Sequence, residues 1–223
     1  MVSANNATLP ERVKQVEDAC QKHGLDVGLV VSRYSFSFVW GYLRSKLVVS
    51  TGLLNAITDV ELAALLEHEV AHHVRRDNLF KWILTICRYL SPAFPLTGLL
   101  YRWWSEQVER VCDEVAAQQT HAPVEVAGAL VRLRRLTLNG QPRRLRSTGA
   151  GFLGEQGEGF ERRVLRVLSL VDQAEINEGL TLSRSWVRDA ALIGVGFALS
   201  LMGLFTVSPL AIHRIIEAIL RIF

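Results

Sequence analysis

Apolar residues recur near the start of the chain in two distinct spacings. In residues 9–24, Val13, Val16 and Ala19 follow the spacing of one helical face, and Gly24 follows them as a stop signal. Short runs rich in Val and Phe come next and favour strands: DVGLVVS at 26–32, SFSFVWG at 35–41 and SKLVVS at 45–50. The pattern predicts a surface helix followed by a three-stranded sheet.

Helical spacing returns after the predicted sheet. Thr58 and Glu61 form the TxxE pattern of a capping box, which predicts the start of a helix that continues through LLEHEVAHHVRRD at 65–77. Further helices are expected over 96–119, 123–138 and 160–174. Six glycines predict a mobile loop or lid at 139–160: Gly140, Gly149, Gly151, Gly154, Gly157 and Gly159. The expected fold class is α+β, mainly helical, with a small N-terminal sheet packed on the helix that contains 65–77.

The C-terminal region contains a long apolar run. Residues 190–212 carry no charge over 23 positions, which at 1.5 Å per residue is long enough to cross a bilayer core of roughly 30 Å. A buried helix of a soluble protein is the alternative. We expect a transmembrane helix at 189–212, an amphipathic interfacial tail at 213–223 and a peptidase domain at 1–188.

A second apolar run, at 79–101, is interrupted by Lys81, Arg88, Pro92 and Pro95. Each proline removes a backbone donor and disfavours a helical residue before it, so one straight helix is not expected. The sequence predicts two helices that meet near residues 92–95. This helical hairpin either packs within the domain or dips into the membrane.

Composition narrows the function classes. The formal net charge is only +3 and both signs are mixed, so nucleic acid is not an expected partner. Cys20, Cys87 and Cys112 are too few and too scattered for a disulfide framework, which favours a reducing compartment. The N-terminus lacks the basic and then apolar pattern of a secretory signal.

His68, Glu69 and His72 spell HExxH within the helix that begins after Thr58. Residues four apart on a helix face the same way, so both imidazoles can reach one Zn2+ at about 2.0–2.1 Å. Glu69 lies beside the metal and can take a proton from metal-bound water. The alternative is a solvated helix face with ordinary histidines, but the capping box and the preceding strand favour the metal site.

A catalytic zinc needs a third protein ligand and one open position for water. The extension HExxHxxGxxH is absent, so a carboxylate is expected, and helix 96–119 offers Glu106, Glu109, Asp113 and Glu114. Glu109 and Asp113 are four apart, on a face with small or apolar neighbours. We therefore assign Glu109 as the third ligand and Asp113 as the acceptor that fixes the tautomer of a zinc-bound histidine. Glu106 and Glu114 fit a charged surface better.

Two segments carry a family resemblance, LVVSTGLLNAITDVELAALLEHEVAHHVRRDNL at 47–79 and EQVERVCDEVAAQ at 106–118. They resemble the membrane metallopeptidases whose best-known members are the beta-lactam sensor-transducers and, more distantly, the heat-shock and CAAX-prenyl-protease type membrane proteases. Both groups use HExxH and a later ExxxD. The resemblance covers about residues 32–138, and the short gap between the two motifs favours the first group.

The resemblance implies a zincin-like fold with zinc held by His68, His72 and Glu109. It also implies Glu69 as the base and Asp113 as a partner of the ligands. In FERRVLRVL at 160–168, where the family often has a basic residue near the cleft, Arg163 is a candidate for stabilising the oxyanion. Several upstream membrane helices common in those proteins have no counterpart here, and no penicillin-sensor domain follows, so a sensor role by analogy is not expected.

The sequence predicts a membrane-associated zinc endopeptidase that hydrolyses a protein or peptide substrate with zinc-bound water activated by Glu69. Strand KLVVS at 46–50 is expected to pair with the extended substrate. The rival hypothesis is a non-catalytic membrane scaffold or sensor with a structural zinc, which needs a fourth ligand; His73, the obvious spare, points away from the His68 and His72 face. A membrane location is expected, with membrane lipid as a partner and the catalytic domain in the cytoplasm. The zinc interpretation excludes a single membrane span at 79–101, because such a span would separate the ligands.

Overall fold

Local signals account for where the first elements begin and end in the computed structural model, which describes residues 8–90, 94–140, 158–171 and 195–196. Helix α1 (Leu9–Gln21) begins after Thr8, whose N–H donates to the Glu11 carboxylate over 2.6 Å. Gly24 follows with φ 66, a left-handed conformation that glycine adopts without strain. The predicted N-terminal helix is therefore present, and it ends at Gln21.

The predicted three-stranded sheet is confirmed, with β1 (Asp26–Val30), β2 (Ser37–Trp40) and β3 (Lys46–Ser50) in the order β1-β3-β2. Strand β3 is parallel to β1 and antiparallel to β2. The expectation that KLVVS pairs with substrate is wrong, because β3 already has a neighbour on each side. Strand β2 is the edge strand on the side of the sheet that packs on the HExxH helix.

A short helix, α2 (Thr51–Ala56), directly follows β3 and was not predicted. The Ser50 hydroxyl caps it by accepting from the Leu53 N–H over 3.2 Å. Gly52 is required here, since a Cβ would lie 2.7 Å from the carbonyl oxygen of Arg33. This close approach connects α2 to the loop after β1.

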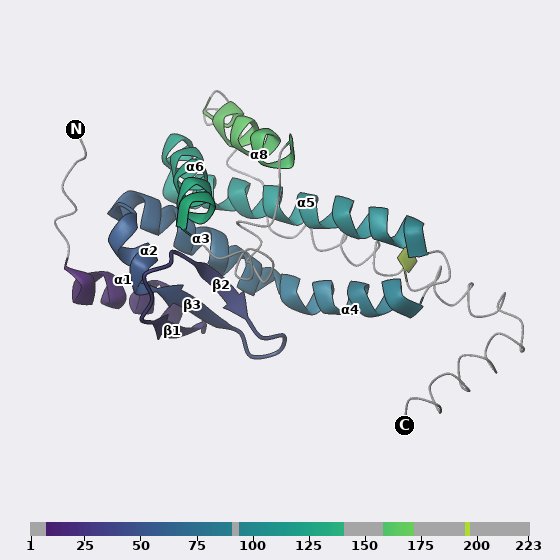
Figure 1. Cartoon of the computed structure of the whole chain (residues 1–223), viewed down its shortest axis with the longest axis horizontal. Helices are drawn as coiled ribbons and strands as arrows, with labels where there is room; N and C mark the ends of the chain where they lie inside the picture. Colours follow the sequence, from purple (N-terminus) through teal and green to yellow (C-terminus); the bar gives the residue numbers. More distant parts are fainter. Residues whose placement is uncertain (1–7, 91–93, 141–157, 172–194, 197–223) are drawn as a thin grey trace, which may run out of the picture. The chain divides into compact units, whose positions relative to one another are not determined.

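The HExxH helix is α3 (Asp59–Arg75), and it packs against α1, β2 and α6 (Pro123–Gly140). Helix α8 (Glu158–Ser169) packs on α6 and ends at Ser169, earlier than the predicted end near residue 174. Figure 1 shows the sheet on one side of α3. One apolar core joins the sheet and helices, with buried side chains that include Leu47, Leu53, Leu65, Leu130 and Val167. The structure thus has the predicted α+β class with a mainly helical content.

The broken apolar run forms two helices, α4 (Asp77–Leu90) and α5 (Phe94–Thr120). The chain divides into two compact units, one made of Met1–Leu79 with Glu106–Gly179 and the other of Phe80–Ser105 with Leu180–Phe223. All the predicted site residues belong to the first unit. The arrangement of the two helices as a hairpin stays a prediction.

Several predicted segments fall on residues that the structure does not describe. The glycine-rich loop lies there over 141–157, and so do the predicted membrane helix and the tail, apart from Val195 and Gly196. Within the described ranges, none of the helices combines the length and the apolar character that crossing a bilayer requires. The C-terminal membrane helix is therefore unconfirmed.

Candidate metal centre

Helix α3 presents the HExxH residues, and its two ends are set by local contacts. The Thr58 hydroxyl accepts from the Glu61 N–H over 3.3 Å, while Glu61 Oε2 accepts from the Thr58 N–H over 2.7 Å, which is the predicted capping box. At the other end Arg76 has φ 55, and its N–H donates to the carbonyls of the last turn. The helix therefore ends one turn after His72, and Asp77 follows directly.

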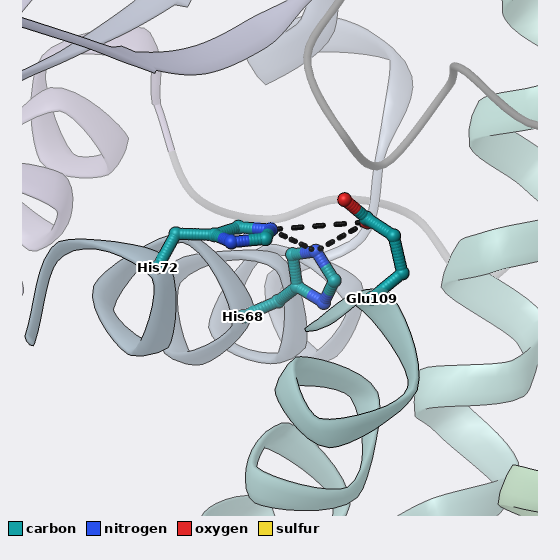
Figure 2. A group of neighbouring side chains, drawn as sticks. All are labelled: His68, His72 and Glu109. Carbon is teal, nitrogen blue, oxygen red and sulfur yellow. Dashed lines mark hydrogen bonds and ion pairs between the residues drawn. The ribbon is translucent and has the colours of Figure 1, made fainter. Parts of the chain in front are cut away.

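His68 and His72 project from the same face of α3, as their spacing predicts. Both side chains are buried, and their Nε2 atoms lie 3.2 Å apart. Glu109 approaches from α5, with Oε2 3.7 Å from His68 Nε2 and 3.8 Å from His72 Nε2. Figure 2 shows the two imidazoles and this carboxylate converging on one point. The structure thus brings together the three residues that were predicted to hold a metal.

The spacing of these three atoms fits a zinc ion. Ligands at about 2.0–2.1 Å in a tetrahedron stand roughly 3.3–3.4 Å from one another. The observed separations of 3.2, 3.7 and 3.8 Å lie close to that value. Two imidazole nitrogens and one carboxylate oxygen are also the donor types of catalytic zinc sites, in which water occupies the fourth position.

Each imidazole has a carboxylate at its other ring nitrogen. Asp113 Oδ1 lies 3.0 Å from His68 Nδ1, and Asp77 Oδ2 lies 2.8 Å from His72 Nδ1. A carboxylate at Nδ1 favours the tautomer that has its proton on Nδ1, which leaves the Nε2 lone pair directed at the shared point. Asp113 thus lies where the sequence predicted it, and Asp77 is the equivalent partner for the second histidine.

Two buried arginines balance the carboxylates. Arg163 of α8 donates to Asp113 over 2.7 and 2.9 Å, and its Nη1 lies 3.5 Å from Glu109 Oε2. Arg75 Nε lies 3.3 Å from Asp77 Oδ1. Burial by itself raises the pKa of Asp113, but Arg163 and His68 hold this pKa below its usual value. Asp113 therefore stays ionised and able to accept from His68.

A second group of possible ligand atoms lies on the far side of His72. Cys112 Sγ lies 3.4 Å from His72 Nδ1 and 3.7 Å from Asp77 Oδ2. Burial raises the pKa of the Cys112 thiol to about 11, so the thiol stays protonated when no metal is bound. Burial alone lowers the pKa of His72, but the Glu109 and Asp77 carboxylates raise it well above its usual value in the metal-free protein. His72 Nδ1 and Asp77 Oδ2 lie 2.8 Å apart, which is a hydrogen-bond distance and shorter than the roughly 3.3 Å between two ligands of one zinc ion, so the group of His68, His72 and Glu109 fits a metal better.

Glu69 lies next to His68 on α3 and is buried. Its Oε1 accepts a hydrogen bond of 3.0 Å from the hydroxyl of Ser37, the first residue of edge strand β2. The other acids of α5 remain outside the group: Glu106 is only partly buried, and Glu114 pairs with the exposed Arg166 over 2.9 Å. His73 also faces elsewhere, with its Nε2 3.2 Å from the carbonyl oxygen of His23.

Sequence reasoning missed Asp77, Ser37 and Cys112. Asp77 had a usable signal, because a carboxylate directly after the HExxH helix is a natural partner for its last histidine. Ser37 had no such signal, because its contact with Glu69 depends on how the strands are arranged and joins residues that are far apart in the chain. Cys112 was noted as a small neighbour, but nothing in its position indicated contact with His72.

Comparison with known proteins agrees with these motifs. The model of peptidase family M48 matches residues 3–215 of the chain. A protease HtpX homolog from Acidiphilium cryptum is 30% identical over 112 residues, which cover 48% of this chain and 38% of the relative. The chain therefore spans well under half of that relative's length, and no solved structure matches it significantly. The prediction of a zinc metallopeptidase family is confirmed, and because the family model covers nearly the whole chain, the protein belongs to peptidase family M48.

Proposed function

We propose that this protein is a zinc-dependent endopeptidase that hydrolyses peptide bonds of a protein or peptide substrate. The observation that carries the proposal is the convergence of His68 Nε2, His72 Nε2 and Glu109 Oε2 at separations of 3.2 to 3.8 Å, with a carboxylate behind each imidazole. Membership of family M48 supports it independently.

The number of ligands favours catalysis over a structural role. A structural zinc site is closed by four protein ligands, whereas a catalytic site keeps one position open. Within the described part of the chain, the group around His68 has three members, all buried. Three ligands from the described residues, with Glu69 beside them, support an enzyme rather than the scaffold or sensor that the sequence left as a rival.

When bound, zinc would supply a Lewis acid that polarises the scissile carbonyl and lowers the pKa of water at the site. Glu69 takes a proton from the attacking water and passes it to the leaving amine. Ser37 donates to Glu69 Oε1, which fixes one carboxylate oxygen and leaves Oε2 for the proton transfer. Asp77 and Asp113 would hold the Nδ1 proton of each histidine, so that Nε2 of both imidazoles is the atom that gives up its proton and binds zinc.

Arg163 has two conceivable tasks, and its contacts support one of them. Its guanidinium is buried and binds Asp113 through two atoms, so it holds the carboxylate that orients His68. Its contact with Glu109 adds positive charge beside a ligand that would otherwise repel Asp113. Direct stabilisation of the oxyanion by Arg163 stays a prediction.

The substrate is expected along edge strand β2 in place of the central strand first predicted. Strand β2 starts at Ser37, whose hydroxyl touches Glu69, and the Val39 and Gly41 carbonyls further along accept from Asn78. A peptide that pairs with the outer edge of β2 near Ser37 therefore passes close to the base. Main-chain pairing supplies affinity without fixing the sequence of the substrate. This arrangement suits the cleavage of unfolded or extended segments.

Membrane association completes the proposal. Residues 190–212 carry no charge over a length that can span a bilayer, so we propose an anchor at 189–212 and a catalytic domain at 1–188 on the cytoplasmic side. Membrane lipid is then a partner of the anchor, while the amphipathic segment 213–223 lies at the interface.

The test of catalysis compares wild type with Glu69→Gln. The variant should bind zinc and melt like wild type, because Glu69 is not a ligand, yet its cleavage of casein should fall by roughly 100- to 10,000-fold. His68→Ala should lose zinc and activity together. Cleavage by Glu69→Gln at the wild-type rate would refute the mechanism. Zinc binding by both proteins without cleavage of casein or of the chain itself would favour the scaffold.

A further inference from the structure

The loop between β2 and β3 exposes large apolar side chains at its tip. Trp40, Tyr42 and Leu43 are 70%, 52% and 80% exposed, and only Gly41 separates the first of them from the other two. Figure 1 shows this loop extending beyond the strands that it connects. Three neighbouring large apolar side chains on a projecting loop indicate a contact surface, because single exposed apolar residues are common but clusters are not. We call residues 40–46 the hairpin tip.

The exposure of the hairpin tip is built into its backbone. Gly41 has φ 103, and a Cβ there would lie 2.3 Å from the Arg44 carbonyl oxygen, so the bend closes tightly. The Asn78 side chain donates to the Val39 carbonyl over 2.7 Å and to the Gly41 carbonyl over 3.3 Å. These contacts fix the base of the loop and hold the tip away from the core.

The charge around the hairpin tip is one-sided. Residues 27–58 contain no Asp or Glu, whereas Arg44 and Lys46 belong to the tip itself and both are exposed. Asp26 lies in register with Lys46 at the start of β1 and offsets part of that charge. Trp and Tyr beside Arg and Lys form the combination found at the boundary between lipid headgroups and acyl chains.

The size of the hairpin tip favours a lipid surface over a protein partner. A specific protein interface buries about 800 Å² on each side. A Trp or Tyr side chain contributes about 150–250 Å² when fully buried, so three partly exposed side chains fall short of that area. A bilayer interface needs no complementary shape, and anionic headgroups attract cations near it.

We propose that the hairpin tip enters the interface of an anionic membrane, with Trp40, Tyr42 and Leu43 at the boundary between headgroups and acyl chains and Arg44 at the headgroups. This contact is separate from the proposed anchor at 189–212 and does not require catalytic activity. Because the tip follows the strand that begins at Ser37, it places the edge strand of the sheet close to the bilayer surface.

The test uses the full chain in lipid vesicles with an environment-sensitive dye on Leu43→Cys in a Cys87→Ser background. Native Cys20 and Cys112 are buried, and burial raises the pKa of their thiols to about 12 and about 11, so they label poorly. The matched control is Leu165→Cys, since Leu165 is 58% exposed on α8. Lipids with a spin label near the headgroup serve as quenchers.

In vesicles that contain phosphatidylglycerol, the dye at the tip should be quenched strongly and the dye at residue 165 should not. Arg44→Gln should lower the ratio of inserted to free tip roughly fivefold, and Lys46→Gln should lower it by up to that factor. A dye on Tyr42→Cys should repeat the result, which guards against a disturbed fold at residue 43.

Three outcomes would overturn the proposal. Equal quenching at the tip and at residue 165 would mean that the tip stays in water. If the dye at the tip is quenched as strongly in vesicles of phosphatidylcholine alone as in vesicles that contain phosphatidylglycerol, Arg44 and Lys46 do not contribute to the binding. A blue-shifted dye that lipid quenchers do not reach would mean that a protein, including a second copy of the chain, covers the tip.

Discussion

Helix α5 carries two pairs of acidic residues that differ in environment although they share one helix. Glu109 and Asp113 are buried, with 3% and 1% exposure, and contact the histidines and Arg163. Glu106 and Glu114 are partly exposed, and Glu114 pairs with Arg166, whose side chain is 53% exposed. Residue type alone therefore does not decide which acid takes part in chemistry.

The difference follows from position around the helix. Residues four apart lie on one face, so Glu109 and Asp113 both point at α3, while Glu114 is turned toward the outer side of α8. Helix α8 repeats the contrast, because Arg163 is buried and Arg166 is exposed. Two ion pairs that join the same two helices thus have different surroundings, and matched variants can compare them.

The largest expected effect is a loss of zinc affinity on substitution of Glu109, which the other glutamates of α5 should not show. Glu109→Ala removes a ligand and should lower zinc affinity by more than about 100-fold. Loss of a group that only hydrogen-bonds to a ligand lowers metal affinity by roughly 10- to 100-fold. Glu106→Ala and Glu114→Ala should bind zinc like wild type. Competition with a chelating dye measures all three, and equal affinities would refute the assignment of Glu109.

Arg163 and Arg166 of α8 should differ in their effect on stability. Arg163→Met leaves Asp113 buried without its partner and should lower the free energy of unfolding by about 3–5 kcal/mol. Arg166→Met breaks a half-exposed pair and should cost at most about 1 kcal/mol. Urea unfolding of the metal-free proteins measures both values.

A double variant serves as the control for the buried pair. Arg163→Met with Asp113→Leu removes both charges, so it should be more stable than Arg163→Met alone. If Arg163→Met and Arg166→Met lower the free energy of unfolding equally, the buried ion pair stabilises the fold no more than the exposed pair does.

Much of the fold was predictable because its signals are local. The capping box at Thr58 and the prolines near residue 92 act through neighbouring residues, and the corresponding helix start and the two separate helices α4 and α5 are present. Strand order is not local: KLVVS has the same alternation whether it lies at the edge or in the centre, so its pairing on both sides was missed. Helix α2 was missed as well, because six residues are too few for a clear period.

The carboxylates behind the histidines should have the next largest effect. Asp77→Asn and Asp113→Asn should each lower zinc affinity by roughly 10- to 100-fold, since an amide in place of the carboxylate weakens the hold on Nδ1. Asp59→Asn is the control, because Asp59 pairs with Arg12 at the other end of α3 and should leave zinc affinity unchanged. If Asp113→Asn lowers zinc affinity and Asp77→Asn does not, only His68 depends on a carboxylate partner for binding zinc.

The smallest expected effect concerns Ser37. Ser37→Ala removes the hydrogen bond to Glu69 and should lower kcat about 2- to 10-fold while KM and zinc content stay unchanged. Ser37→Thr keeps the hydroxyl and should restore most of the rate. A change in KM alone would mean that Ser37 contributes to substrate binding and does not orient the base.

The site was predictable only where helix geometry defines it. His68, His72, Glu109 and Asp113 follow from spacing on two helices and from the donor types that zinc requires. Asp77 directly follows the HExxH helix in the sequence, but its contact with His72 also depends on the left-handed conformation of Arg76, which is uncommon outside glycine. Ser37 depends on how β2 packs against α3, and such a contact between distant segments is visible only in the folded chain.

X-ray absorption at the zinc edge of the loaded wild-type protein tests the central claim most directly. We expect one zinc per chain bound by nitrogen and oxygen atoms at about 2.0–2.1 Å, two of them from imidazoles, with no sulfur neighbour. A sulfur atom at about 2.3 Å would place the ion in the group of His72, Asp77 and Cys112. That result would contradict the site formed by His68, His72 and Glu109.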